Sequence, residues 1–320
     1  MKVTKKMLNP DLQKYYEPLN LAAPILKNEV GIKIINFLLK FLESKKIKGF
    51  KNEVVRVPSK SSETLIRTRI FRPENQTENL PCILFNHGGG YLMGNPEQFL
   101  FIIEKMLRAR PCVLIAPDYR LSLEAPYPAA FNDCYDTLLW AKENAEKLQI
   151  HPDRFIIAGH SAGGGLTAAI TNKARDTQDL NIAFQMPIYP MLDDRQVTES
   201  AKDIEVPVWN TKSNSFAWNS YLKDIYEKKV NVPVYAAPGR NTDFTDFPPT
   251  ITFVGEYEPF RDETLAYVEN LRSAGIPVKF KFYEKVFHAF DLVAPNSAIG
   301  MDAINFTIDS FGEFYDKYCK

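Results

Sequence analysis

Cysteine and histidine are both scarce in this chain, with four residues of each type among 320. The cysteines are far apart and form no Cys-x-x-Cys pair, and none of them clusters with a histidine, so we expect no structural metal site. Cys82 and Cys112 lie in apolar runs typical of buried strands. Free buried thiols are typical of a reducing compartment, and we therefore expect a cytoplasmic protein.

Net charge is also absent, because 39 basic side chains balance 39 acidic ones. This balance provides no overall attraction to nucleic acid or to an anionic membrane. No window holds the roughly 18 apolar residues of a membrane-spanning helix, and the opening residues lack the apolar stretch of a secretion signal. We expect no nucleic-acid partner and no stable membrane association.

What the chain does contain is a 45% hydrophobic share, enough for a large core. From residue 81 onward, short apolar runs typical of strands buried on both faces alternate with helical patterns such as 131–148. This alternation predicts an α/β fold with a mostly parallel central sheet and helices on both faces. The predicted strands are 53–57, 64–71, 82–85, 112–116, 155–158, 182–189, 251–254 and 278–283.

Two regions depart from the alternation. Residues 1–50 have a helical pattern, with Val30, Ile34, Phe37, Leu38 and Phe41 at helical spacing. Residues from about 195 to 237 lack a clean strand and are rich in aromatic side chains, which suggests an inserted helical cap, although a plain helical crossover is the alternative. We predict an N-terminal cap segment (1–50) and a catalytic domain (51–320) with a cap insertion at about 195–237.

A candidate nucleophile lies in the pattern Gly-x-Ser-x-Gly at residues 159–163, with Ser161 at its centre. A predicted strand precedes it and an Ala/Gly-rich helical pattern follows it. This is the context of the nucleophile elbow, a tight turn that projects the serine hydroxyl above the sheet edge. Glycines stand two positions either side because side chains there would collide with neighbouring backbone.

A glycine run, Gly88-Gly89-Gly90, follows His87 directly after a predicted strand. Backbone N–H groups in such a run can stabilise the oxyanion of a tetrahedral intermediate, together with the amide of Ala162. We favour Gly89 plus one neighbour. Phosphate binding is the competing use of a glycine run, but no Lys-Ser/Thr pair follows here.

The base and the acid must be sought after the nucleophile. His288 follows the last predicted strand, and the order serine, acid, histidine is that of the α/β hydrolases. The acid should follow the strand 251–254, where four acidic residues compete. Glu258 stands before a proline and outside the next helix, and is our choice. Asp262 is the alternative acid, although it is better suited to the first turn of that helix.

These motifs resemble the hormone-sensitive-lipase-like esterases, also called bacterial family IV esterases. The similarity covers about residues 81–290 and includes HGGG, GHSAGG, DYRL, PYPAA, HPDR, YP and FRDE. The family usually has aspartate before the proline where this chain has Glu258. The resemblance implies the α/β-hydrolase fold and a cap built from the N-terminal helices and the segment around 209–226. It leaves a homodimer open by analogy.

Together these residues predict a serine hydrolase that cleaves carboxylic esters through an acyl-enzyme, without metal or organic cofactor. The resemblance and the aromatic-rich insertion suggest short or medium acyl chains on a small-molecule substrate. The amphipathic first fifty residues offer the apolar entrance that a long-chain lipase needs, but a cap helix is the favoured interpretation. Amidase or acyltransferase activity on the same site is an alternative, and so is a small-molecule receptor with hydrolysis disabled.

Overall fold

The apolar runs of the sequence become the strands of one sheet in the computed structural model, which describes residues 1–320. Eight strands follow the order β1-β2-β4-β3-β5-β6-β7-β8. The first two pairs in this order are antiparallel and all the others are parallel, so the predicted mostly parallel sheet is confirmed. The strands are β1 (Phe50–Pro58), β2 (Leu65–Pro73), β3 (Leu80–Asn86), β4 (Val113–Pro117), β5 (Ile150–His160), β6 (Ile182–Ile188), β7 (Thr250–Tyr257) and β8 (Val278–Phe287).

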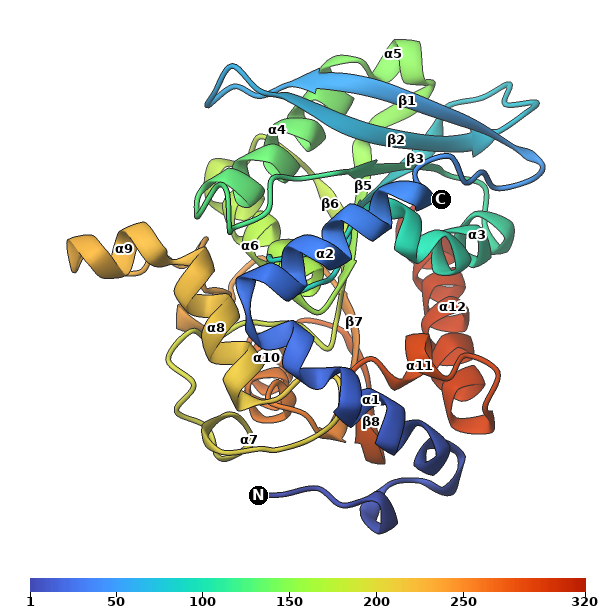
Figure 1. The fold of residues 1–320 in the computed structure, drawn as a ribbon. Coiled ribbons are helices and arrows are strands. Elements are labelled where there is room, and N and C mark those ends of the chain that lie inside the picture. The colour runs from blue at the N-terminus through green and yellow to red at the C-terminus, as the bar shows by residue number, and fades with distance from the viewer.

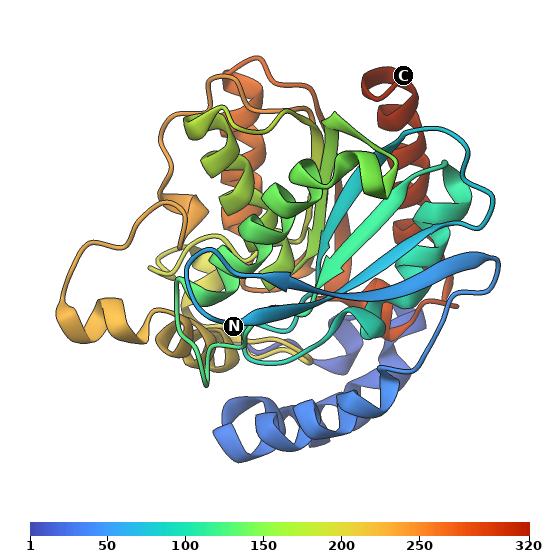
Figure 2. The same cartoon turned by 90° about the horizontal axis from the view of Figure 1, so that it is seen from above.

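Helices cover both faces of the sheet (Figures 1 and 2). The α-helices are α1 (Tyr16–Ala22), α2 (Glu29–Leu39), α3 (Leu100–Ala109), α4 (Ala129–Glu143), α5 (Ala145–Leu148), α6 (Ala162–Thr177), α7 (Glu199–Lys202), α8 (Thr211–Tyr221), α9 (Lys223–Lys228), α10 (Arg261–Ser273), α11 (Phe290–Val293) and α12 (Ala298–Tyr318). Short 3-10 helices are η1 (Lys5–Met7), η2 (Pro10–Tyr15), η3 (Ala23–Lys27), η4 (Lys40–Leu42), η5 (Pro96–Phe99) and η6 (Pro238–Arg240). None of the helices has both the length and the apolar character needed to cross a bilayer.

The central strand β3 shows how the sheet divides the core. Because successive side chains of a strand point to opposite faces, Ile83 and Phe85 pack in one cluster with α3 and α12. Cys82 and Leu84 pack in the other, with α4 and α6. Every residue of β3 is buried. This two-sided burial explains why the strand reads as an unbroken apolar run rather than an alternating one.

The helical pattern of residues 131–148 forms two helices instead of the single one expected. Helix α4 ends before Asn144, whose backbone leaves the helical region at φ −106° and ψ 21°. The Asn144 side chain donates to the carbonyl of Trp140 at 2.9 Å. The same carbonyl also accepts from the backbone amide of Asn144 at 3.0 Å, so the two helices meet at this residue without the loss of that helical bond.

The N-terminal helices and the insertion between β6 and β7 lie side by side. The amide of Val3 donates to the carbonyl of Glu205, and the amide of Glu205 donates to the carbonyl of Met1, both at 2.9 Å. In Figure 1, α2 and α1 cross the front of the view and α8 lies next to them, in contact with η3. The division into cap and catalytic domain stays a prediction.

Candidate active site

Ser161 lies at the turn between β5 and α6. Its backbone has φ 59° and ψ −120°, a strained conformation for a residue with a side chain. The turn is held because the Ser161 amide donates to Ile188 at 2.9 Å and its carbonyl accepts from Gly165 and Met191 at 2.9 and 3.0 Å. The strand below and the helix above therefore fix the direction of the hydroxyl.

The glycines flanking Ser161 allow backbones to approach closely. A Cβ on Gly159 would lie 2.3 Å from the carbonyl oxygen of Gly163. A Cβ on Gly163 would lie 2.0 Å from the carbonyl oxygen of Asn86, the last residue of β3. Neither position has room for a side chain, because the obstacle in both cases is backbone. This is the packing that the Gly-x-Ser-x-Gly pattern predicted.

His288 follows β8, which is separated from β5 by β6 and β7, and its side chain reaches Ser161. Its Nε2 lies 2.9 Å from the hydroxyl oxygen of Ser161. His288 is 3% exposed, and its imidazole stands edge-on to the rings of Tyr189 and Phe260, at centroid distances of 4.8 and 5.0 Å. These two aromatic rings leave the imidazole little freedom to rotate.

Glu258 meets the other nitrogen of this imidazole. One carboxylate oxygen lies 2.6 Å from Nδ1 of His288, and the second accepts a 2.7 Å hydrogen bond from the amide of Gly255. The side chain is fully buried. With both oxygens engaged, the carboxylate can hold Nδ1 protonated and leave Nε2 as an acceptor for the serine proton. Glutamate, whose side chain is one methylene longer, thus makes this contact at the position where the family usually has aspartate.

The other acidic residues of this segment face elsewhere. Asp262 lies in the first turn of α10, where it bonds the guanidinium of Arg261 at 2.7 Å and the amide of Ser200 at 2.8 Å, and it makes no hydrogen bond to His288. Burial alone would raise the pKa of Asp262, but these hydrogen bonds bring it below its ordinary value. Glu263 is buried and accepts from the amides of Leu192 and Asp193, and burial raises its pKa well above the usual range.

The three other histidines do not contact Ser161 through a ring nitrogen. Burial lowers the pKa of His87 to about 4, and its ring stacks on Tyr119 at 4.0 Å. Burial, with a smaller effect of nearby His288, lowers the pKa of His160 to about 3. His151 lies inside β5 at the end of the strand opposite Ser161.

The glycine run after β3 passes beside the nucleophile. A Cβ on Gly88 would lie 3.5 Å from the Cβ of Ser161. Gly89 and Gly90 have φ of 123° and 63°, conformations that other residues rarely adopt. None of these three amides donates a hydrogen bond to another group of the protein. Ala162 is the first residue of α6, where helix geometry leaves the N–H without a partner in the helix.

Aromatic side chains of the insertion cover this loop. Trp209 is 3% exposed, and a Cβ on Gly90 would lie 2.3 Å from its indole ring. Tyr91 stacks on Tyr221 of α8 at a centroid distance of 3.9 Å. The aromatic content of the insertion is evident in the sequence, but it does not indicate a role for Trp209, nor for Tyr189 and Phe260 beside His288. The signal for Tyr189 and Phe260 was their place within the YP and FRDE motifs, and the signal for Trp209 was its place in the aromatic-rich insertion.

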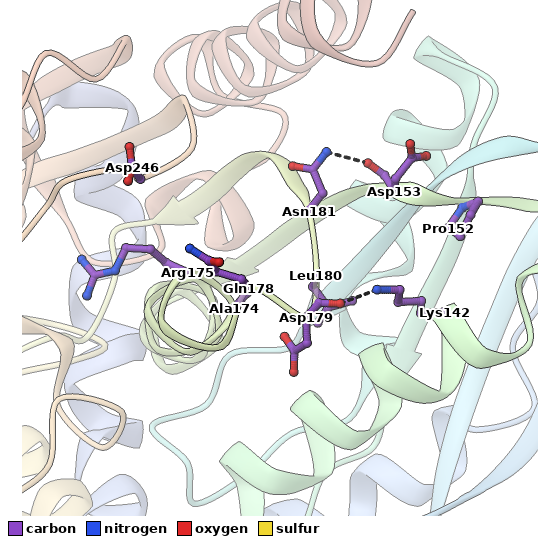
Figure 3. Close-up of a pocket in the computed structure, with 10 residues that line it drawn as sticks. All are labelled: Lys142, Pro152, Asp153, Ala174, Arg175, Gln178, Asp179, Leu180, Asn181 and Asp246. Atoms are coloured by element: carbon purple, nitrogen blue, oxygen red, sulfur yellow. Dashed lines mark hydrogen bonds between the residues drawn. The ribbon is translucent and has the colours of Figure 1, made fainter.

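The hollow in Figure 3, of about 580 Å³, is a separate feature. It is lined by Pro152 and Asp153 at the start of β5 and by Arg175 at the end of α6. Ser161 lies at the other end of both elements. Because β5 to β8 are parallel, the hollow lies at the amino-terminal ends of these strands and the serine at their carboxyl-terminal ends. In the lining of this hollow, the side-chain amide of Asn181 donates a hydrogen bond to the carbonyl of Asp153 at 3.0 Å.

The sheet order and helical layers define the α/β-hydrolase fold, and a model of the alpha/beta hydrolase fold family matches residues 83–292. The chain belongs to this superfamily, and within it to the hormone-sensitive-lipase-like esterases. The resemblance noted from the motifs is thereby confirmed.

Relatives of known name support this placement. Esterase LipI of Mycobacterium tuberculosis is 32% identical over 228 residues, covering 70% of this chain and 71% of LipI. An arylesterase of Saccharolobus solfataricus is 32% identical over 231 residues, covering 69% of this chain and 72% of the arylesterase. The solved structure of a bacterial heroin esterase has a TM-score of 0.86 with 28% identity, covering 98% of this chain and 99% of that one.

Proposed function

We propose that this protein is a serine esterase that hydrolyses small carboxylic esters, with Ser161 as nucleophile, His288 as general base and Glu258 as the acid. The observation that carries the proposal is the line of contacts from the hydroxyl through both imidazole nitrogens to the carboxylate, at 2.9 and 2.6 Å. The esterase names of the relatives support ester hydrolysis, and nothing among them favours an amidase, an acyltransferase or a receptor.

The proposed reaction proceeds by acyl transfer. The oxygen of Ser161 attacks the ester carbonyl carbon as its proton passes to Nε2 of His288, and the carbonyl electron pair moves to oxygen. The tetrahedral intermediate collapses, and the departing alcohol takes the proton from Nε2. A water molecule then attacks the acyl-serine, gives one proton to the imidazole, and the carboxylic acid leaves as Ser161 recovers its proton.

Glu258 acts throughout by stabilising the imidazolium that forms in each half-reaction. Its buried carboxylate is already oriented by the Gly255 amide, so it does not need to reorganise when the charge develops. The carboxylate keeps its negative charge and takes no proton in the cycle.

The amides of Gly88, Gly89, Gly90 and Ala162 are the proposed source of oxyanion stabilisation. Two features support this role: the loop passes beside Ser161, and its amides are not used elsewhere in the protein. Each correctly placed donor is worth about 2.7–4 kcal/mol of transition-state stabilisation. Gly89 plus one neighbour, with Ala162, is the combination we favour.

Short or medium acyl chains are the proposed substrates. The support is the indole of Trp209, which packs directly on Gly90 and takes up space beside the proposed oxyanion site. A cytoplasmic location is also part of the proposal and is supported by four free, buried cysteines. Assembly as a homodimer stays a prediction, which light scattering on the purified protein checks.

The test is the Ser161→Ala variant, assayed on p-nitrophenyl acetate, butyrate, octanoate and dodecanoate. We expect turnover to fall by about 10⁴-fold or more, the scale seen when a triad serine is removed. A fluorophosphonate probe should label the wild type and leave the variant unlabelled. Ser44→Ala is the matched control, because Ser44 is exposed and far along the chain from the site. Retained turnover or labelling in Ser161→Ala would contradict the assignment.

A further inference from the structure

Exposed apolar side chains gather on the first helices of the chain. Of the seventeen large hydrophobic residues that remain exposed, seven lie between Leu21 and Phe41. Five of these form one stripe along α2 and η4, which we call the outer face. Its members are Val30, Ile34, Phe37, Leu38 and Phe41, each at least 55% exposed. Such a concentration is more than the scattered apolar residues normal for a protein surface.

The opposite face of α2 is already docked on the protein. Ile32 is fully buried. The Asn36 side chain donates to the carbonyl of Leu92 at 3.0 Å and accepts from the amide of Gly94 at 3.2 Å. Residues of a helix separated by half a turn point in opposite directions, so the outer face is directed away from the molecule. In Figure 2, α2 (blue) lies at the periphery of the molecule.

Lysines accompany the outer face. Residues 21–51 contain seven lysines against two glutamates, a local net charge of +5 in a chain whose total is zero. Lys33 is exposed on α2 and Lys40 is exposed at the start of η4. Lys45, Lys46 and Lys48 follow η4 and are also exposed. An apolar stripe beside basic side chains is the pattern of a helix that lies in the plane of an anionic lipid surface.

We propose that the outer face of α2 docks this protein reversibly on anionic lipid membranes. The apolar side chains would enter the boundary between head groups and acyl chains, while the lysines contact the lipid phosphates. This differs from the expectation that the chain has no membrane partner. It remains consistent with the lack of a spanning helix, because an interfacial helix lies on the bilayer.

A second copy of the chain fits this surface less well. In a two-fold dimer the same patch meets itself, so the lysines of one subunit would oppose those of the other. Like charges at an interface oppose association. Anionic head groups instead neutralise the lysines as the apolar stripe is buried, which satisfies both features of the surface together.

Docking through α2 would place the proposed active site next to the membrane. Asn36 holds the segment that continues from the Gly88–Gly90 loop, and Asn95 donates to the carbonyl of Leu39 at 2.9 Å. An ester dissolved in the bilayer would therefore arrive beside the loop. This consequence rests on the proposed function, whereas the docking itself does not.

Vesicle flotation tests the docking in the full-length Ser161→Ala protein, so that catalysis plays no part. We expect binding to phosphatidylcholine vesicles that contain phosphatidylglycerol, and weaker binding to phosphatidylcholine alone. Phe37→Ser with Phe41→Ser should lower the partition coefficient by at least about tenfold. Lys33→Gln with Lys40→Gln should lower binding to the anionic vesicles only. Phe101→Ser with Phe282→Ser, two exposed aromatics elsewhere, should change nothing.

Each variant is first checked by circular dichroism for a native melting transition. Equal flotation of the Phe37/Phe41 variant and its matched control would overturn the proposal. The proposal would also be overturned if the wild type failed to float and was dimeric by light scattering, and Phe37→Ser with Phe41→Ser made it monomeric. Failure of the esterase assay would leave the flotation result unaffected, so the two proposals fail separately.

Discussion

Replacing Glu258 by glutamine removes one negative charge from the proposed triad and almost no volume. The carboxylate oxygen lies 2.6 Å from Nδ1 of His288, and the second oxygen accepts from the Gly255 amide. Glutamine can keep one of these contacts but carries no charge to stabilise the imidazolium. It can also present its NH₂ group to Nδ1, which favours the tautomer with the proton on Nε2 and prevents that nitrogen from accepting the serine proton.

The size of the effect follows from the distance. Two unit charges about 4 Å apart, the separation of the centres of a contacting carboxylate and imidazolium, attract by about 4 kcal/mol at an effective dielectric constant of about 20. A loss of that size in the transition state slows the reaction by about 10³-fold. The tautomer effect adds to this, and the comparable change in a serine protease costs about 10⁴-fold. We therefore expect kcat to fall by about 10³–10⁴-fold with little change in KM.

The assay is steady-state hydrolysis of p-nitrophenyl butyrate, beside a thermal melt to show that each variant is folded. The matched control is Asp262→Asn, which removes a carboxylate four residues away that bonds Arg261 and Ser200. We expect its kcat to stay within about threefold of wild type, because Asp262 makes no hydrogen bond to His288 or Ser161. Glu258→Asp should be intermediate, since its shorter side chain reaches Nδ1 only if the loop moves.

A Glu258→Gln variant that keeps more than a tenth of the wild-type kcat would refute this reasoning. So would an Asp262→Asn variant that loses more activity than Glu258→Gln, because the acid would then have to be reassigned. If only Glu258→Gln loses its melting transition, Glu258→Asp, which keeps the charge, takes its place in the test. Full activity of Glu258→Asp together with an inactive Asp262→Asn would then refute the assignment of Glu258 as the acid.

Two further predictions concern stability. Burial raises the pKa of Asp291, a neighbour of the site, to about 7. Because the pKa of this carboxyl in the unfolded chain is about 4, the stability of the wild type falls as pH rises from about 4 to about 7. Asp291→Asn should therefore stabilise the protein more at pH 8 than at pH 4, by at most about 4 kcal/mol, and equal melting shifts at both pH values would contradict this. Gly163→Ala should lower the free energy of unfolding, measured in urea, by more than about 3 kcal/mol, because the new Cβ would lie 2.0 Å from a carbonyl oxygen. Gly275→Ala, in open space at φ +77°, should lower it by only about 1–2 kcal/mol. Equal losses in the two variants would show that the structure relieves the crowding at Gly163.

Most of the fold could be predicted because its signals are local. The strand β3 is an unbroken apolar run because both of its faces are buried, and β5 and α6 flank the serine motif as the elbow pattern requires. The break at Asn144 could not be predicted, since only the backbone angles of that residue change and the helical periodicity continues beyond it. Periodicity reports which side chains share a face, but it does not reveal where the backbone leaves the helical conformation.

The sequence alone was sufficient to indicate the α/β-hydrolase class, the serine and histidine motifs and the glycine run, because each depends on residues adjacent in the chain. Only the tertiary structure decided that Glu258, and not Asp262, faces the imidazole, because the two lie four residues apart and the loop between β7 and α10 sets their directions. It also decided which apolar stripe of α2 is buried: Ile32 packs inward and Phe37 remains exposed, although both are large hydrophobic side chains. Chain neighbours determine a local pattern, whereas the contacts of a side chain depend on segments brought together by the sheet.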